Sequence, residues 1–237
     1  MAAMELYRLL HEQGFGGRKA CKELVEAGLV EVDGEVVDNA RARVDPDTLE
    51  TLLVDGEPWP LVRGHLYLML NKPGGYETSH KPTYYPSVFS LLPWQYGNLD
   101  VNAVGRLDAD TTGLLLLTTD GQFVHALTSP KKQVGKVYRV TIKHPIGQEL
   151  VDQLLAGVLL KDDDVVVAAD AVDVLDPHTL DMTLFQGKYH QVKRMVAAAG
   201  NRVEALHRIR IGELALGELA PGQWRHLSAT ELASFGF

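Results

Sequence analysis

This sequence has a single cysteine, no long apolar run and no excess of basic residues. The single cysteine, Cys21, excludes an internal disulfide bond and a zinc site built on cysteines. No apolar stretch approaches the roughly 18 residues of a membrane helix. Residues 1–15 carry charges where an export signal would have its apolar core. We therefore expect a cytoplasmic protein without membrane contact.

The net charge of -8 argues against a protein that binds nucleic acid through its whole surface. The charges are, however, unevenly distributed. Residues 121–148 contain five Lys or Arg, Lys131 among them, and no acid, and residues 188–210 contain six against the single Glu204. The intervening residues 149–181 contain nine acids against Lys161 alone. If the two basic segments share a face, that face suits phosphate groups; the alternative is charge segregation on solvated loops.

The segment from Val104 to Gly121 is the most informative part of the chain. Its four consecutive leucines, 114–117, predict a strand buried on both faces. A Gly-Arg-Leu-Asp turn precedes that strand and carries Arg106 and Asp108. A charged loop on a rigid strand is typical of active sites. On these two residues alone, a structural ion pair at the entrance of the strand would explain the pattern equally well.

The full motif, GRLDADTTGLLLLTTDG, resembles the signature loop of the small-subunit ribosomal RNA pseudouridine synthases, the RsuA family. The resemblance implies that Asp108 is the catalytic carboxylate. It also implies isomerisation of uridine to pseudouridine, in which the C1′–N1 bond breaks and C5 bonds to C1′. This reaction involves no net redox change or group transfer, so we expect neither a cofactor nor a metal.

Further motifs in the family's order assign roles to other residues. In the Lys-x-Tyr motif, Tyr138 would pack on the target base, although a strand tyrosine in the core fits the same pattern. In His-Gln-Val-Lys-Arg-Met, Lys193 would lie against the catalytic carboxylate and Arg194 would meet phosphate. Arg208, in the closing element, is counted with the residues that bind RNA. Arg106 would steady the uridine once it has left the base stack.

The N-terminal part predicts two short helices followed by a hairpin around Asp33-Gly34. This arrangement resembles the S4 RNA-binding domain, although Glu residues dilute its basic surface. We expect an α+β protein, with an S4-like domain over residues 1–60. The catalytic domain would follow over residues 61–237, built on a mixed, mostly antiparallel sheet flanked by helices.

Three other features have a structural and a functional interpretation. The Asn-Lys-Pro element at Lys72 would support the catalytic loop without taking part in the chemistry. His190 lacks a partner at ligand spacing and is not a convincing base or metal ligand. Residues 76–98 read as a loop whose aromatics could stack on bases, although packing under the loop is the commoner role. Those aromatics are Tyr84, Tyr85, Trp94 and Tyr96.

The sequence thus predicts a monomeric enzyme that isomerises a specific uridine in small-subunit ribosomal RNA, free or in an assembly intermediate. A large-subunit ribosomal RNA substrate is the alternative within the family. Outside it, the alternatives are a non-catalytic RNA-binding assembly factor and a hydrolase with Asp108 as nucleophile. The hydrolase would need a paired acid and base or a metal site, and the sequence offers neither.

Overall fold

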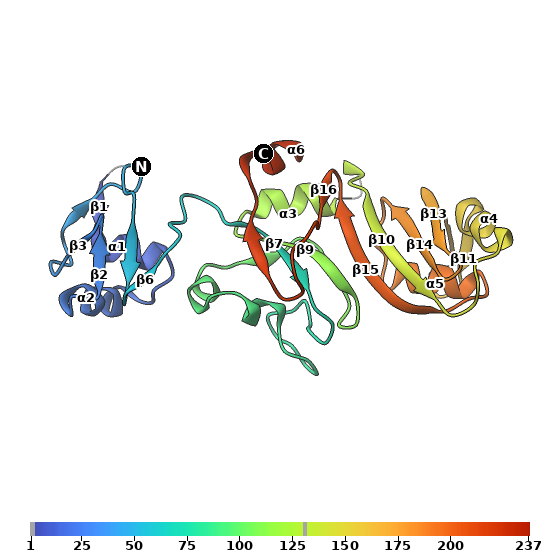
Figure 1. The fold of residues 1–237 in the computed structure, drawn as a ribbon, viewed down its shortest axis with the longest axis horizontal. Helices are drawn as coiled ribbons and strands as arrows, with labels where there is room; N and C mark the ends of the chain where they lie inside the picture. The colour runs from blue at the N-terminus through green and yellow to red at the C-terminus, as the bar shows by residue number, and fades with distance from the viewer. Residues whose placement is uncertain (1–2, 130–131) are drawn as a thin grey trace. The chain divides into compact units, whose positions relative to one another are not determined.

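The computed structural model describes residues 3–129 and 132–237, so Lys131 of the first basic segment lies outside the described residues. The chain forms two compact units (Figure 1). The first comprises Met1–Leu66 and Leu92–Asn102, and the second comprises Tyr67–Leu91 and Ala103–Phe237. No helix within the described ranges combines the length and the apolar character that crossing a bilayer requires.

The first unit contains the expected pair of helices and the hairpin. The helices are α1 (Leu6–Glu12) and α2 (Arg18–Glu26). Asp33 and Gly34 both have positive φ angles, 51° and 84°, as a two-residue hairpin turn requires. The strands form a sheet of order β3-β2-β5-β6 and a separate pair, β1 with β4. Their bounds are β1 (Met4–Glu5), β2 (Val30–Val32), β3 (Glu35–Val36), β4 (Arg43–Val44), β5 (Leu52–Val54) and β6 (Glu57–Pro58).

A segment distant in sequence completes this unit. Residues 92–102, which contain the 3₁₀ helix η2 (Trp94–Asn98), pack against the turn that follows α1. Asn98 Nδ2 donates to the carbonyl of Gly14 at 2.8 Å, and a β-carbon on Gly14 would lie 2.1 Å from the carbonyl oxygen of Gln95. The compact units therefore divide the chain at different points from the expected domains, whose boundary after residue 60 stays a prediction.

The second unit is built on a nine-stranded sheet in which β15 and β9 run parallel, while the pairs β13–β14, β14–β10, β10–β15, β15–β16, β9–β7 and β7–β17 are antiparallel. Along its main path the order is β13-β14-β10-β15-β9-β7-β17. The mixed, mostly antiparallel sheet predicted from the sequence is thereby confirmed. Its strands are β7 (Tyr67–Lys72), β8 (Asn102–Ala103), β9 (Thr112–Thr118), β10 (Lys136–Ile142), β13 (Ala171–Asp176), β14 (Thr179–Leu184), β15 (Val203–Ile211), β16 (Leu214–Ala215) and β17 (Trp224–His226). A separate hairpin pairs β11 (Val158–Leu160) with β12 (Val165–Val167).

The leucine-rich strand β9 lies between β15 and β7, and all four of its leucines are buried. Gly113, at its start, has a φ of +101°. A β-carbon there would lie 2.3 Å from the carbonyl oxygen of Arg208 on β15. Only glycine allows this close parallel pairing. The loop that carries Asp108 thus leads into the interior of the sheet.

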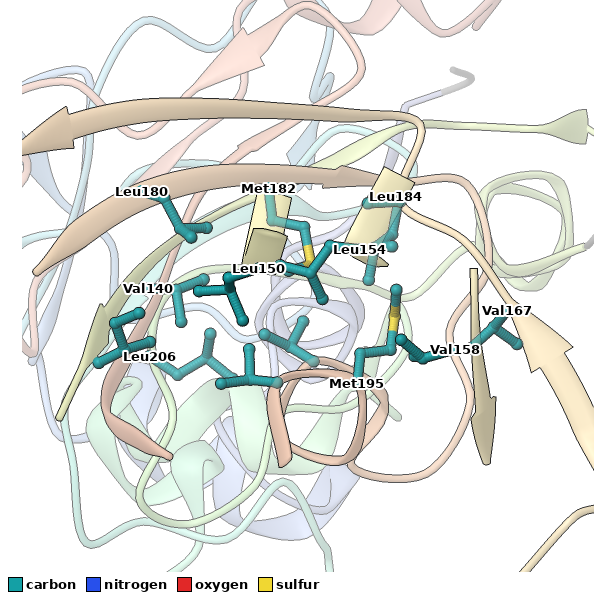
Figure 2. Close-up of a cluster of buried hydrophobic side chains, with 14 of the residues drawn as sticks. Val140, Leu150, Leu154, Val158, Val167, Leu180, Met182, Leu184, Met195 and Leu206 are labelled. Carbon is teal, nitrogen blue, oxygen red and sulfur yellow. The ribbon is translucent and has the colours of Figure 1, made fainter. Parts of the chain in front are cut away.

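Helices cover the sheet and complete its core. In one core cluster, Leu154 of α4 (Gln148–Ala156) and Met195 of α5 (Gln191–Ala198) meet Val140, Met182 and Leu206 of the sheet (Figure 2). A second cluster joins α3 (Gly121–Thr128) to β7 and β9. A short 3₁₀ helix, η1 (Val88–Leu91), and a C-terminal helix, α6 (Ala229–Ser234), complete the unit. The packing of α5 brings its N-terminal end to the loop before β9.

Candidate active site

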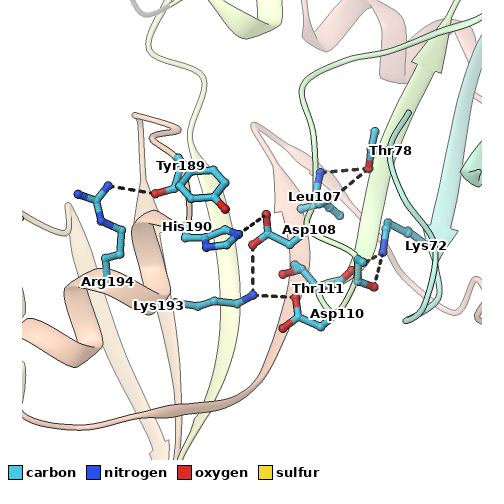
Figure 3. Close-up of polar contacts among 11 residues, drawn as sticks. Lys72, Thr78, Leu107, Asp108, Asp110, Thr111, Tyr189, His190, Lys193 and Arg194 are labelled. Atoms are coloured by element: carbon cyan, nitrogen blue, oxygen red, sulfur yellow. Dashed lines mark hydrogen bonds and ion pairs between the residues drawn. The ribbon is translucent and has the colours of Figure 1, made fainter. Parts of the chain in front are cut away.

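Asp108 lies at the centre of a polar cluster on the loop before β9 (Figure 3). Lys193 Nζ lies 3.2 Å from Asp108 Oδ2, and His190 Nε2 lies 3.2 Å from Oδ1. Each oxygen of the Asp108 carboxylate therefore faces a side-chain nitrogen of a residue at the N-terminal end of helix α5. The side chain of Asp108 remains 30% exposed, so a substrate can reach it.

Lys193 also contacts a second carboxylate, at a Nζ to Asp110 Oδ1 distance of 2.7 Å. Burial would lower the pKa of the Lys193 ammonium, but its hydrogen bonds to Asp110 and Asp108 outweigh that effect and raise it. The pKa of Asp110 is lowered: burial acts to raise it, and the hydrogen bond from Lys193 prevails. Lys193 is thus a cation throughout the neutral range, and its positive charge lies beside Asp108.

His190 is a contact of Asp108 that the sequence did not predict. It precedes α5 with φ 46° and ψ 33°, a left-handed conformation that is rare for a residue with a β-carbon. Its ring stacks on that of Tyr189 at 3.8 Å. Since His190 and Lys193 are three residues apart at the start of a helix, both reach the same carboxylate. This three-residue spacing is the signal in the sequence that indicates a shared contact for His190 and Lys193.

Lys72, the last residue of β7, holds the loop from behind. Its side chain is fully buried, and Nζ donates to the carbonyls of Thr111, Pro73 and Ala109 at 2.8, 3.0 and 3.1 Å. Burial lowers the pKa of this ammonium to about 8, although the carboxylates of Asp110 and Asp108 oppose the change. All three N–H donors are used on backbone acceptors, which agrees with the predicted supporting role of the Asn-Lys-Pro element.

A small cavity opens beside Asp108. Its volume is about 70 Å³, and its lining includes Arg106, Asp108, Tyr138 and His190. Tyr138 comes from β10 and is only partly buried, with its ring packed against the core cluster of α4 and α5. Arg106 is exposed. The structure therefore brings four of the predicted or newly found residues around one space.

A larger cleft of about 680 Å³ adjoins this cavity and shares Arg106 and Tyr138 with it. Lys136, Lys188 and Arg208 also line the cleft. The first and last of these three come from neighbouring strands, β10 and β15, so parts of the two basic segments do lie side by side. The cleft is consequently rich in positive charge, with Asp170 as an acidic member of its lining.

Arg208 lines this cleft, is almost completely buried, and makes two hydrogen-bond contacts. Its Nε donates to the carbonyl of Leu114 at 2.8 Å, and Nη1 lies 3.4 Å from the hydroxyl of Tyr138. Its Nη2 is buried and has no hydrogen-bond partner among residues 3–129 and 132–237. A buried cationic donor without an acceptor is costly, and an acceptor on a bound ligand would remove that cost.

Arg194 lies apart from the cluster around Asp108. Its guanidinium is paired with Asp163 at 3.1 Å and approaches Asp162 at 3.6 Å. It also donates to the carbonyl of Tyr189, and Figure 3 shows it extending away from Asp108. The guanidinium of Arg194 is therefore held by the acidic turn between β11 and β12.

Two protein families match the chain. The family described as RNA pseudouridylate synthase matches residues 66–198, and the S4 domain matches residues 6–49. The chain therefore belongs to the RNA pseudouridylate synthases and carries an S4 domain, so the predicted family and the S4-like fold are confirmed.

Individual relatives span nearly the whole chain. A protein of Yersinia pestis named ribosomal small subunit pseudouridine synthase A is 40% identical, with 98% of each chain covered. Its namesake in Escherichia coli K12 is 38% identical, with 98% of this chain and 99% of the relative covered. A crystal structure of a pseudouridylate synthase superposes with a TM-score of 0.69 at 32% identity and covers 98% of this chain and 99% of its own.

Proposed function

We propose that the protein isomerises a specific uridine of small-subunit ribosomal RNA to pseudouridine, with Asp108 as the catalytic carboxylate. The observation that carries the proposal is the paired carboxylate: Asp108 faces Lys193 and His190 and still borders a cavity. An ionised carboxylate in a partly buried site needs such a compensating cation. The ribosomal substrate is supported by the names of relatives that match over nearly the full length.

The reaction requires the C1′–N1 bond to break, the uracil to turn, and C5 to bond to C1′. The proton that leaves C5 is balanced by the one that N1 takes up, so no cofactor is needed. Asp108 would attack C1′ or C6 of the uracil or remove the proton at C2′, and all three roles require it ionised and within reach of the nucleoside.

The neighbouring residues supply binding functions in this proposal. A uridine inside folded RNA must leave its stack to reach Asp108. Tyr138, on the cavity wall, would hold the face of the uracil, and exposed Arg106 would enter the vacated position. Arg208, whose Nη2 has no hydrogen-bond partner in the described part of the chain, would donate to a substrate oxygen in the adjoining cleft. Arg194 would meet phosphate only after exchanging its contacts with the acidic turn.

The proposal is tested by mapping pseudouridine in ribosomal RNA from cells that lack the protein and are resupplied with variants. The wild type should restore one small-subunit site, and Asp108→Asn should restore none while keeping its fold and most of its RNA affinity. Asp110→Asn is the matched control, because Asp110 contacts the same lysine but is 74% exposed. We expect this control to restore the site.

Three outcomes would change the conclusion. A missing large-subunit site would keep the chemistry and correct the substrate. Normal pseudouridine formation by Asp108→Asn would refute the assignment of the carboxylate. Wild-type protein that restores no site in ribosomal RNA would favour the non-catalytic assembly factor.

A further inference from the structure

The loop between β7 and η1 displays two tyrosines that the fold does not bury. Tyr84 is 88% exposed and Tyr85 is 51% exposed, whereas Tyr96, in the same loop-like stretch of sequence, is fully buried in the first unit. The packing role expected for the aromatics of this stretch therefore applies to Tyr96, and these two tyrosines require another explanation. Pro82 and Pro86 bracket them and restrict the backbone.

The tip of this loop is held by a single carboxylate. Glu77 accepts hydrogen bonds from the backbone N–H groups of Thr83, Tyr84 and Tyr85 at 2.9, 2.7 and 3.0 Å. These bonds lower the pKa of Glu77, and the nearby charge of Arg106 lowers it further. The tyrosines thus project from an ordered backbone, even though their rings lie in solvent.

The base of the loop is closed and attached to the catalytic loop. Glu77 N donates to the carbonyl of Pro86, and Val88 N donates to the carbonyl of Glu77, both at 2.9 Å. The hydroxyl of Thr78 donates to the carbonyl of Leu107 at 2.9 Å and accepts from its N–H at 3.3 Å. Leu107 immediately precedes Asp108, so the tyrosine loop and the reactive carboxylate belong to one connected backbone structure.

We propose that Tyr84 and Tyr85 form a stacking platform for unpaired nucleotides of the substrate RNA that flank the target uridine. This inference rests on the proposed function, because it names the part of the substrate that lies beside the site. Aromatic side chains stack on bases of any sequence, and a pre-ordered tyrosine loses little freedom on binding. The attachment of Thr78 to Leu107 places the base of this loop beside the residue that precedes Asp108, and Arg106, whose charge acts on Glu77, lines the cavity of Asp108.

The test measures the affinity of the full-length protein for a short, labelled, single-stranded RNA and, as a comparison, for an RNA duplex. Tyr84→Ala and Tyr85→Ala should each weaken single-strand binding by about 5- to 150-fold, the range for loss of one base–aromatic stack. Tyr84→Phe should bind like the wild type. Leu175→Ala, at a 51% exposed position on the edge strand β13, is the matched control and should have no effect.

Glu77→Ala separates stacking from simple electrostatics. Removal of an acid near a phosphate-binding surface would by charge alone tighten RNA binding. In our proposal the variant loosens the tyrosines and weakens binding, so the two explanations predict opposite signs. In turnover assays on ribosomal RNA, the tyrosine variants should raise KM and leave the saturated rate unchanged.

Three results would overturn the platform: wild-type affinity in both alanine variants, tighter binding by Glu77→Ala, or no binding of single strands by the wild type. These results are independent of the mapping experiment. If no pseudouridine depends on the protein, the proposed function fails, and the comparison of oligonucleotide affinities still decides the role of the loop.

Discussion

Replacement of Lys72 by methionine tests whether the loop that carries Asp108 is held in place by one buried ammonium group. Lys72→Met keeps the length and volume of the side chain but removes three hydrogen bonds, of which the one to Thr111 is fully buried. The other two acceptors, the carbonyls of Pro73 and Ala109, are partly buried. Ala109 directly follows Asp108, so the change acts on the position of the carboxylate.

The magnitude follows from two opposing terms. A buried carbonyl without a donor costs about 1–3 kcal/mol, so we assign about 3 kcal/mol to Thr111 and about 1 kcal/mol to each of the other two. The pKa of Lys72 is lowered to about 8, which corresponds to about 3 kcal/mol of uncompensated desolvation that methionine relieves. The net expectation is a loss of about 2 kcal/mol of stability. A loop displacement of about 1 Å would reduce the rate about 100-fold.

Urea denaturation and single-turnover pseudouridine formation at saturating protein measure the two effects separately. Lys136→Met is the control for stability, because Lys136 is also a desolvated lysine but its Nζ donates to one carbonyl, that of Val134, at 2.9 Å. We expect this control to lose less than about 1 kcal/mol. A Lys72→Met protein with the wild-type urea midpoint and the wild-type single-turnover rate would refute the reasoning.

Two further predictions concern the framework. Gly113→Ala should destabilise the protein by at least about 2 kcal/mol in thermal or urea unfolding. Gly113 has a φ of +101°, and a β-carbon at this position would lie 2.3 Å from the carbonyl oxygen of Arg208. An unchanged unfolding midpoint would contradict the close pairing of β9 and β15. Glu231 is bonded to Arg225 at 2.8 and 2.6 Å, and the hydrogen bonds from Arg225 lower its pKa to about 2. Because the folded-state pKa lies below the unfolded value, this pair stabilises the fold above about pH 4.5, and the stabilisation is lost as the pH falls toward 2. Because the Arg225 side chain is 40% exposed, solvent screening limits this stabilisation to about 1 kcal/mol. The Glu231→Gln protein should therefore be less stable than the wild type at pH 7 and equally stable near pH 2. A stability difference that does not change with pH would exclude the ion pair as its source.

Most of the second unit's sheet was predictable because its strands have strong local patterns. The leucine run of β9 and the alternation of β10 fix which faces are buried before any neighbour is known. Short elements without a local turn signal were not predictable, in contrast to the Asp33-Gly34 hairpin. The pairing of β1 with β4 and the return of residues 92–102 to the first unit depend on contacts between distant parts of the chain.

The residues of the candidate site show the same difference between those that a local motif indicates and those whose contacts depend on distant parts of the chain. Asp108 and Lys193 were found through motifs, and the structure places them 3.2 Å apart. His190 was missed because its contact depends on a left-handed backbone at the start of α5, and no local pattern specifies that conformation for histidine. The pairing of Arg194 with Asp163 was equally invisible, since it joins a helix to the turn between β11 and β12.

The charges around Asp108 also explain why the site needs a basic cleft beside it. Asp108, Asp110 and Lys193 together carry a net charge of about -1 when all three are ionised, and a net negative cluster repels the phosphates on either side of a target nucleotide. Arg106 and Lys188 line the cavity next to this cluster and offset its field. Because the chain has a net charge of -8, its affinity for RNA depends on the positions of the few Lys and Arg side chains that line the cavity.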